Sequence, residues 1–178
     1  AQIIRAGKAP RSLFPWNKGQ LYNGCVHMGA AHLWHVCMEG LHLVDLPSEG
    51  FGGYCVMSDN DEELKKHLPA VNAATGRILK TGLGMGCFVR MCLAAGNVEH
   101  IDVVEINKSV IDHFGKEFEG ESRVTIHHAD AFEFNLDNGP WDFAWHDIYC
   151  DGNDGLQLLH AKLMKRYAPV ASLQGAWA

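Results

Sequence analysis

The stretch Arg77–Glu105, RILKTGLGMGCFVRMCLAAGNVEHIDVVE, sets the organisation of the chain. A short apolar run is followed by glycines on alternate positions, Gly82, Gly84 and Gly86, and then by closely spaced apolar residues typical of a buried helix. A small-residue break precedes a second apolar run, which ends at an acid. This order of strand, glycine-rich turn, helix and strand predicts a βαβ unit that holds a nucleotide-like ligand.

Each part of this unit suits a ligand that carries a ribose. Glycines permit positive φ and let a ligand approach the main chain closely. The helix that begins near Cys87 directs its free N–H groups toward the loop. Glu105 lies 21 residues after Gly84, where a carboxylate can accept the protons of both ribose hydroxyls. The structural alternative is a tight turn followed by a solvated Glu105.

The glycine spacing separates several classes of nucleotide-binding loop. Dinucleotide folds favour G-x-G-x-x-G, whereas the third glycine here comes one residue earlier, which disfavours a nicotinamide-dependent enzyme. No Lys-Ser or Lys-Thr pair follows the loop, so it is not a phosphate-binding P-loop. Gly-Leu-Gly-Met-Gly resembles motif I of the class I S-adenosylmethionine (SAM)-dependent methyltransferases and of the related spermidine synthases.

The resemblance continues beyond the loop and covers the chain from Ala70 to Trp177. The segment His128–Phe132 resembles the family's segment after strand three, and Trp141–Asp147 resembles its strand four. In that family the loop passes under the amino-acid part of SAM, the acid after strand two binds the ribose, and the acid after strand three contacts the adenine. The residues that the resemblance assigns to the cofactor are Gly82, Leu83, Gly84, Gly86, Glu105, Ile106, Asp130 and Ala131.

The chain departs from the family pattern at Lys80. Many methyltransferases carry an acid at this position, two residues before the first glycine. Spermidine synthases often lack that acid, as this chain does. The motif therefore leans toward the spermidine synthase-like branch. In spermidine synthases an aspartate matching Asp147 helps to orient or deprotonate the attacking amine, and another acid follows three residues later. Here that later position is Cys150, with Asp151 one residue further, which disfavours polyamine chemistry.

Asp147 directly follows the predicted fourth strand. Because ligands of open parallel sheets bind outside the carboxyl ends of the strands, we expect Asp147 beside the glycine loop as the catalytic residue that orients the acceptor. A cap on the next helix is the alternative. His146, Tyr149 and Asp151 are candidates for the acceptor side. Since side chains alternate along a strand, one of His146 and Asp147 is expected to point away from the cleft.

The amino-acid composition indicates which classes of protein are compatible with this chain. The chain has 178 residues, 47% of them hydrophobic and 20% charged, as in an ordinary globular domain. The net charge of −6 and the scattered basic residues argue against a nucleic-acid partner, which needs a basic face. No apolar run approaches the length of a transmembrane helix, so no membrane association is expected. Six cysteines without a C-x-x-C pair predict reduced thiols and a cytoplasmic location.

The remaining segments complete the predicted organisation. Residues 1–58 form an irregular arm and a small β-region, and residues 59–178 form a single SAM-binding unit. Strands are expected at Leu33–Cys37, Leu41–Asp45 and Tyr54–Met57. His27, His32 and His35 cluster in this region, but no carboxylate or cysteine joins them at a ligand spacing, so no metal site is predicted. A helix follows, which Pro69 is expected to kink or restart.

Taken together, the sequence predicts an α/β, Rossmann-like, mostly parallel sheet of order 3-2-1-4-5, C-terminally short, with a small N-terminal β-region. The last strand leaves a sheet edge that needs cover, which suggests a homo-oligomer. The favoured function is SAM-dependent methyl transfer to a small-molecule acceptor by in-line displacement, with catalysis mostly from positioning. Two alternatives stay open: aminopropyl transfer from decarboxylated SAM, and a non-catalytic SAM-binding or oligomeric protein.

Overall fold

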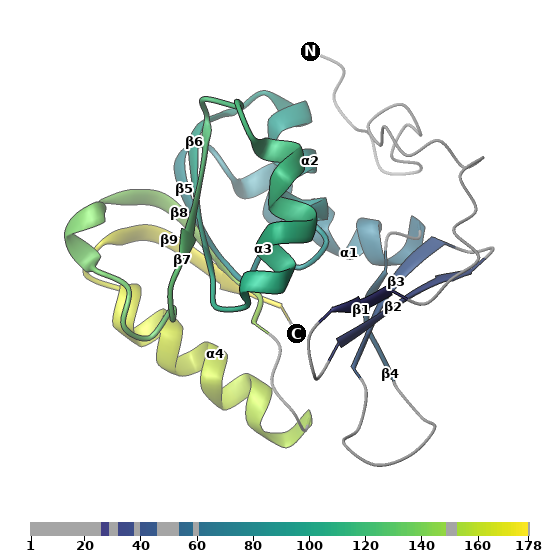
Figure 1. The fold of residues 1–178 in the computed structure, drawn as a ribbon. Coiled ribbons are helices and arrows are strands. Elements are labelled where there is room, and N and C mark those ends of the chain that lie inside the picture. Colours follow the sequence, from purple (N-terminus) through teal and green to yellow (C-terminus); the bar gives the residue numbers. More distant parts are fainter. Residues whose placement is uncertain are drawn as a thin grey trace.

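A computed structural model describes residues 61–148 and 153–177, together with the backbone of four strands at 26–28, 32–37, 40–45 and 54–58. These four strands are β1 (Val26–Met28), β2 (His32–Cys37), β3 (Gly40–Asp45) and β4 (Tyr54–Ser58), and they form an antiparallel sheet in that order (Figure 1). β2 and β3 pair as a hairpin with Cys37 opposite Gly40. The three predicted strands of this region are therefore present, and β1 is an additional one.

A second, five-stranded sheet carries the predicted nucleotide-binding unit. Its strands are β5 (Gly76–Thr81), β6 (Val98–Glu105), β7 (Val124–His128), β8 (Trp141–His146) and β9 (Ala171–Ala176). Every neighbouring pair is parallel, and the order is β7-β6-β5-β8-β9. This is the order 3-2-1-4-5 that the sequence predicts. All five strands consequently end at the same edge of the sheet, which is where ligands of such folds bind.

Helices cover both faces of this sheet (Figure 1). They are α1 (Asp61–Ala73), α2 (Cys87–Ala95), α3 (Lys108–Phe114) and α4 (Asn153–Tyr167), with short 3₁₀ turns η2 (Gly115–Phe118) and η3 (Leu136–Asn138). The first three helices share one apolar core, which includes Phe88 and Phe114, whereas α4 contributes Leu163 and Tyr167 to a core on the other side. The result is a three-layer α/β/α arrangement.

Helix α1 carries Pro69 in its interior. It is one continuous helix to Ala73, so of the two expected outcomes, a kink or a restart at Pro69, the restart does not occur. Pro69 is exposed, so its ring faces solvent while Leu64 and Val71 on the same helix enter the core. The packing of this apolar face thus outweighs the backbone hydrogen bond that proline cannot donate. None of the helices in the described part of the chain is long and apolar enough to cross a membrane.

Candidate functional site

The glycine loop between β5 and α2 has the backbone that its sequence predicts. Gly82, Gly84 and Gly86 all have positive φ, at 83°, 55° and 76°. A Cβ at Gly82 would collide with the carbonyl oxygen of Asp147, so this position also needs glycine for space. Among the described residues, no side chain caps the start of α2, where Gly86 is the N-cap residue. The loop therefore presents main chain rather than side chains at the carboxyl edge of the sheet.

Glu105 holds this loop against the tip of β6. One carboxylate oxygen accepts a hydrogen bond from the Leu83 N–H at 2.7 Å, and the other accepts one from the Asn107 N–H at 2.8 Å. The residue is only 8% exposed. A carboxylate offers about four lone-pair positions, so these two bonds leave capacity for ligand hydroxyls. Glu105 thus has a structural role in addition to the ribose contact expected from the sequence.

The other residues expected at the cofactor lie at the ends of β6 and β7. Ile106 is 65% exposed, although it is a large apolar residue directly after Glu105. Asp130 is half-buried, and its carboxylate accepts a hydrogen bond from the Phe132 N–H at 2.8 Å. Ala131 is buried, and its carbonyl oxygen accepts from the Tyr167 hydroxyl at 2.7 Å. The parallel strands bring these positions to the edge that carries the glycine loop.

Asp147 lies at this edge as well and forms an ion pair with Lys80. The Nζ of Lys80 lies 2.9 Å from Oδ2 of Asp147, and the lysine side chain is 1% exposed against 18% for the aspartate. Lys80 also donates to the Thr81 carbonyl oxygen at 3.3 Å, and the Asp147 N–H donates to the same oxygen at 3.0 Å. The lysine that departs from the family pattern is therefore neutralised by an aspartate 67 residues away.

His146 faces the interior instead of the cleft. It is fully buried, with Nδ1 3.1 Å from the Thr81 hydroxyl and Nε2 3.1 Å from the side-chain oxygen of Gln174. Burial lowers its pKa from 6.5 to about 4, so the ring is neutral near pH 7. Both nitrogens of His146 bond to the protein in this placement, and its acceptor-side role stays a prediction. Tyr149 and Asp151, the other two acceptor-side candidates, lie outside the described residues.

The structure adds one residue that the sequence interpretation missed, His67 on α1. Its ring is fully buried and lies against Trp177 with a centroid distance of 4.6 Å. Burial lowers its pKa to about 4; the charge of Asp147 opposes this shift and that of Lys80 adds to it. The imidazole therefore lies near the ion pair. No sequence motif marks it, because only tertiary packing brings α1 to this position.

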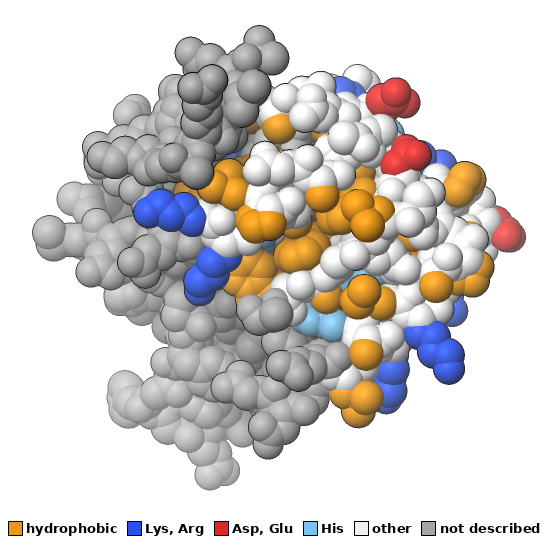
Figure 2. Space-filling model, turned by 180° about the vertical axis from the view of Figure 1, so that it is seen from behind, with side chains coloured by type: hydrophobic (Ala, Val, Ile, Leu, Met, Phe, Trp, Pro, Cys, Tyr) orange, Lys and Arg blue, Asp and Glu red, His pale blue; other side chains and the backbone are white. Residues whose placement is uncertain are grey.

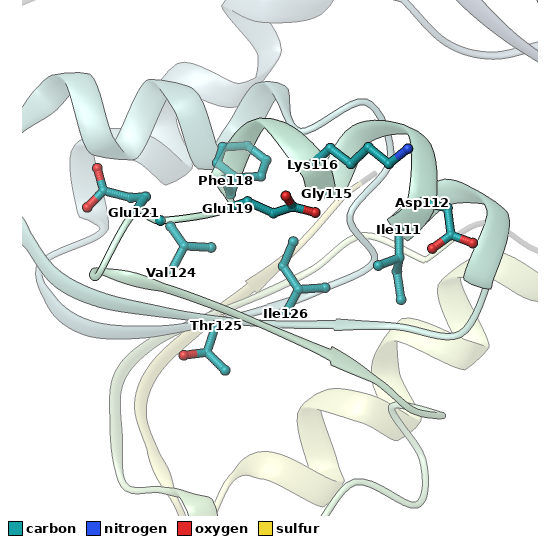
Figure 3. Close-up of a pocket in the computed structure, with 11 residues that line it drawn as sticks. Ile111, Asp112, Gly115, Lys116, Phe118, Glu119, Glu121, Val124, Thr125 and Ile126 are labelled. Atoms are coloured by element: carbon teal, nitrogen blue, oxygen red, sulfur yellow. The ribbon is translucent and has the colours of Figure 1, made fainter.

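A separate pocket of about 370 Å³ lies at the start of β7 (Figure 3). It is lined by α3, η2 and the β7 residues Val124, Thr125 and Ile126. Of the residues that the sequence assigns to cofactor or acceptor, none of those that the structure describes contributes to it. This pocket lies toward the amino end of β7, and Phe118 in its lining also approaches Gly86 of the glycine loop. Within the described residues, no group of three or more potential metal ligands is positioned to hold an ion.

Parts of the chain are similar in sequence to a known protein. No family model matches the chain. A ribosomal RNA small subunit methyltransferase A from Pseudomonas fluorescens (strain Pf0-1) is 33% identical over 72 residues, which are 40% of this chain and 26% of that protein. The chain thus matches about a quarter of the length of this curated relative.

Solved structures resemble the chain over a longer span. A protein named as an RNA methyltransferase from Pyrococcus horikoshii matches with a TM-score of 0.51 at 14% identity, covering 67% of this chain and 60% of that one. The chain has the fold of the class I SAM-dependent methyltransferases. A caffeoyl-CoA O-methyltransferase structure from Staphylococcus aureus has a TM-score of 0.46 at 20% identity, over 61% of this chain and 50% of that one.

Proposed function

We propose that this chain is a SAM-dependent methyltransferase. In this proposal the loop Gly82–Gly86 receives the methionine part of SAM, Glu105 binds the ribose, and Ile106 packs against the adenine. Asp130 and Ala131 contact the adenine edge. The observation that carries the proposal is the Glu105 carboxylate, which is bonded to the loop N–H of Leu83 while it keeps lone pairs for ribose hydroxyls.

Asp147 is the proposed acceptor-orienting residue. Its Oδ2 is held by Lys80, so the carboxylate has a fixed position beside the glycine loop. The other carboxylate oxygen can then accept a hydrogen bond from another polar group of the acceptor molecule and so orient it. Methyl transfer needs a nucleophile in line with the C–S bond of SAM, and positioning of this kind supplies much of the rate enhancement in such reactions.

The acceptor we propose first is a small molecule, because a net charge of −6 disfavours a polyanionic partner. RNA is the second candidate, and it is favoured by the identity of 33% over 72 residues to a protein named as a ribosomal RNA methyltransferase. Aminopropyl transfer and binding without turnover are the further alternatives. The compared proteins are named as methyltransferases, so methyl transfer comes first.

The first experiment is a calorimetric titration with SAM, S-adenosylhomocysteine, decarboxylated SAM, methylthioadenosine and NAD in turn. Glu105→Gln is the test variant, because it keeps the size of the side chain while replacing one acceptor oxygen by a donor. Glu99→Gln on the same strand is the matched control, since Glu99 is exposed near the start of β6.

We expect SAM and S-adenosylhomocysteine to bind with micromolar affinity, about 10-fold or more weaker in Glu105→Gln and unchanged in Glu99→Gln. A preference for decarboxylated SAM and methylthioadenosine would instead favour aminopropyl transfer. Binding of none of the five ligands would refute the proposal, because the glycine loop would then be only a structural turn.

A further inference from the structure

His67 comes from α1, yet it lies beside the carboxyl edge of the sheet. Its ring centroid is 4.6 Å from that of Trp177 and 6.1 Å from that of Phe88. The Nζ of Lys80 lies 5.8 Å from the centroid of the same Phe88 ring and pairs with Asp147. The imidazole, the ion pair and these aromatic rings therefore form one contiguous cluster next to the glycine loop. None of the cofactor contacts proposed above uses His67.

Neither ring nitrogen of His67 has a hydrogen-bond partner among the residues that the structure describes, although the side chain is fully buried. Buried polar atoms are nearly always paired, and leaving one unpaired costs free energy. A neutral imidazole offers one donor and one acceptor. A phenylalanine would fill a similar volume at this position without that cost. The histidine is therefore best explained by a hydrogen-bonding group that a ligand brings to it.

Trp145 on β8 supplies a second, independent observation in the same cluster. Its indole N–H is buried and has no partner within the described part of the chain. The Trp145 ring stacks on Phe88, with centroids 6.2 Å apart and planes 13° apart. Two unpaired polar groups thus flank one phenylalanine. Buried tryptophans usually find a partner for this N–H, so its isolation again indicates a ligand.

The rim of the cluster is aromatic and basic. Trp177 is half-buried, and the Nζ of Lys66 lies 5.8 Å from the centroid of its ring. Figure 2, the view from behind, shows hydrophobic side chains gathered at the centre of this face, with basic side chains on both sides of them and the acidic side chains near one edge. Flat aromatic walls favour a flat ligand, because offset stacking adds to the burial of apolar area.

We propose that His67, with Trp145 and Trp177, binds the methyl acceptor, and that this acceptor is a small planar molecule with an N–H or O–H nucleophile. The inference rests on the proposed methyltransferase function. The acceptor donates its hydrogen to a nitrogen of His67, while its lone pair attacks the methyl carbon of SAM. The C–S bond breaks with its electron pair moving to sulfur, which yields S-adenosylhomocysteine and the methylated product. The acceptor proton passes to His67 and then to water.

His67→Phe tests this role, and His160→Phe is its matched control. His160 is also buried and also has an unpaired Nε2 within the described residues, but it lies on α4, which covers the opposite face of the sheet. Each full-length variant is incubated with SAM carrying a tritiated methyl group and with separated small-molecule, RNA and protein fractions of a cell extract. SAM affinity is measured by calorimetry, and Tm by calorimetric scanning.

We expect His67→Phe to label the small-molecule fraction about 100-fold more slowly than the wild type. Its SAM affinity should stay within about 2-fold, and its Tm should rise by about 2–4 °C because two unpaired polar atoms are removed. His160→Phe should label this fraction as the wild type does.

Labelling by His67→Phe at the wild-type rate would overturn the inference, as would a fall in its Tm together with a loss of SAM affinity. Tritium label that appears only in the RNA or protein fraction would overturn the proposal that the acceptor is a small molecule. A wild type that binds SAM but labels no fraction would also overturn the inference, whereas a wild type that binds no SAM refutes the underlying function instead.

Discussion

The ion pair between Lys80 and Asp147 allows a quantitative test of how this site is built. Asp147→Asn removes the countercharge of an ammonium group that is 1% exposed. Breaking a buried pair from one side costs about 3–5 kcal/mol, because a charge is left without compensation. The Thr81 carbonyl at 3.3 Å and the Phe88 ring at 5.8 Å still contact the ammonium. The expected loss in free energy of unfolding is therefore near the lower limit, at about 3 kcal/mol.

Replacing the lysine instead of the aspartate should lower the free energy of unfolding by less. Lys80→Met keeps most of the side-chain length and leaves a carboxylate whose side chain is 18% exposed, so water can partly solvate it. We expect a loss of about 1–2 kcal/mol. The double variant Lys80→Met with Asp147→Asn removes both charges and should be close to the wild type, since the lost attraction is offset by the avoided desolvation.

Urea unfolding at pH 7 measures these differences, and the four proteins form a double-mutant cycle. A loss of about 3 kcal/mol corresponds to a fall in Tm of about 6–12 °C for a chain of this size. Additive losses would contradict the buried contact. If the losses of the two single variants sum to the loss of the double variant, with a coupling energy below about 0.5 kcal/mol, the two charges do not share such a contact.

Three further predictions follow from the described contacts. Burial alone would raise the pKa of Asp102, but hydrogen bonds from His127, Trp141 and Arg77 outweigh burial and hold that pKa below its usual range. The ionised Asp102 therefore stabilises the fold at any pH above its pKa in the unfolded chain. This stabilisation is lost as the pH falls through its pKa in the folded protein. Asp102→Asn should cost about 2–4 kcal/mol in urea unfolding at pH 7, with a gap from the wild type that narrows below about pH 4, and a gap independent of pH would contradict this sign. Because burial lowers the pKa of His146 from 6.5 to about 4, the wild type should lose up to roughly 3 kcal/mol of stability as the pH falls from about 6.5 toward 4, and His67 should add a similar pH dependence. His146→Gln should make this decline less steep when urea midpoints are measured between pH 4.5 and 7. An unchanged slope would show that His146 is not buried in its neutral form. Gly82→Ala should weaken both stability and SAM binding more than Gly96→Ala does, because both glycines have positive φ but, of the two, only Gly82 would bring a Cβ against another group, the carbonyl of Asp147. Gly96→Ala should lower the free energy of unfolding by about 1–2 kcal/mol from backbone strain alone. Equal losses of stability in thermal unfolding would argue against the close approach at Gly82.

Much of the fold could be predicted because its signals are local. The alternating glycines between an apolar strand and an apolar helix require positive φ, and all three have it. Short strands separated by helices predict a parallel sheet, and a right-handed crossover leaves few possible strand orders. Whether α1 continues through Pro69 or restarts there could not be predicted in this way, because the outcome depends on how well the helix packs against the core.

The composition of the site depended on contacts that are distant in sequence. Lys80 was recognised as a departure from the family pattern, but its partner Asp147 comes from the end of another strand. His146 and Asp147 are neighbours in sequence, and only the structure shows that the histidine is the one that faces the core. His67 has no motif at all, and its place beside the ion pair follows from the docking of α1.

Local sequence signals are enough to predict the βαβ unit, the positions of the glycine loop and Glu105, and the edge of the sheet where a ligand would bind. These features follow from backbone sterics, hydrophobic periodicity and strand direction, which short segments encode. The pairing of charged and polar groups, in contrast, follows from the folded arrangement, because burial and hydrogen bonding depend on side chains that packing brings together. The pairing of Lys80 with Asp147 belongs to this second group, as does the lack of a hydrogen-bond partner for the His67 nitrogens among the described residues.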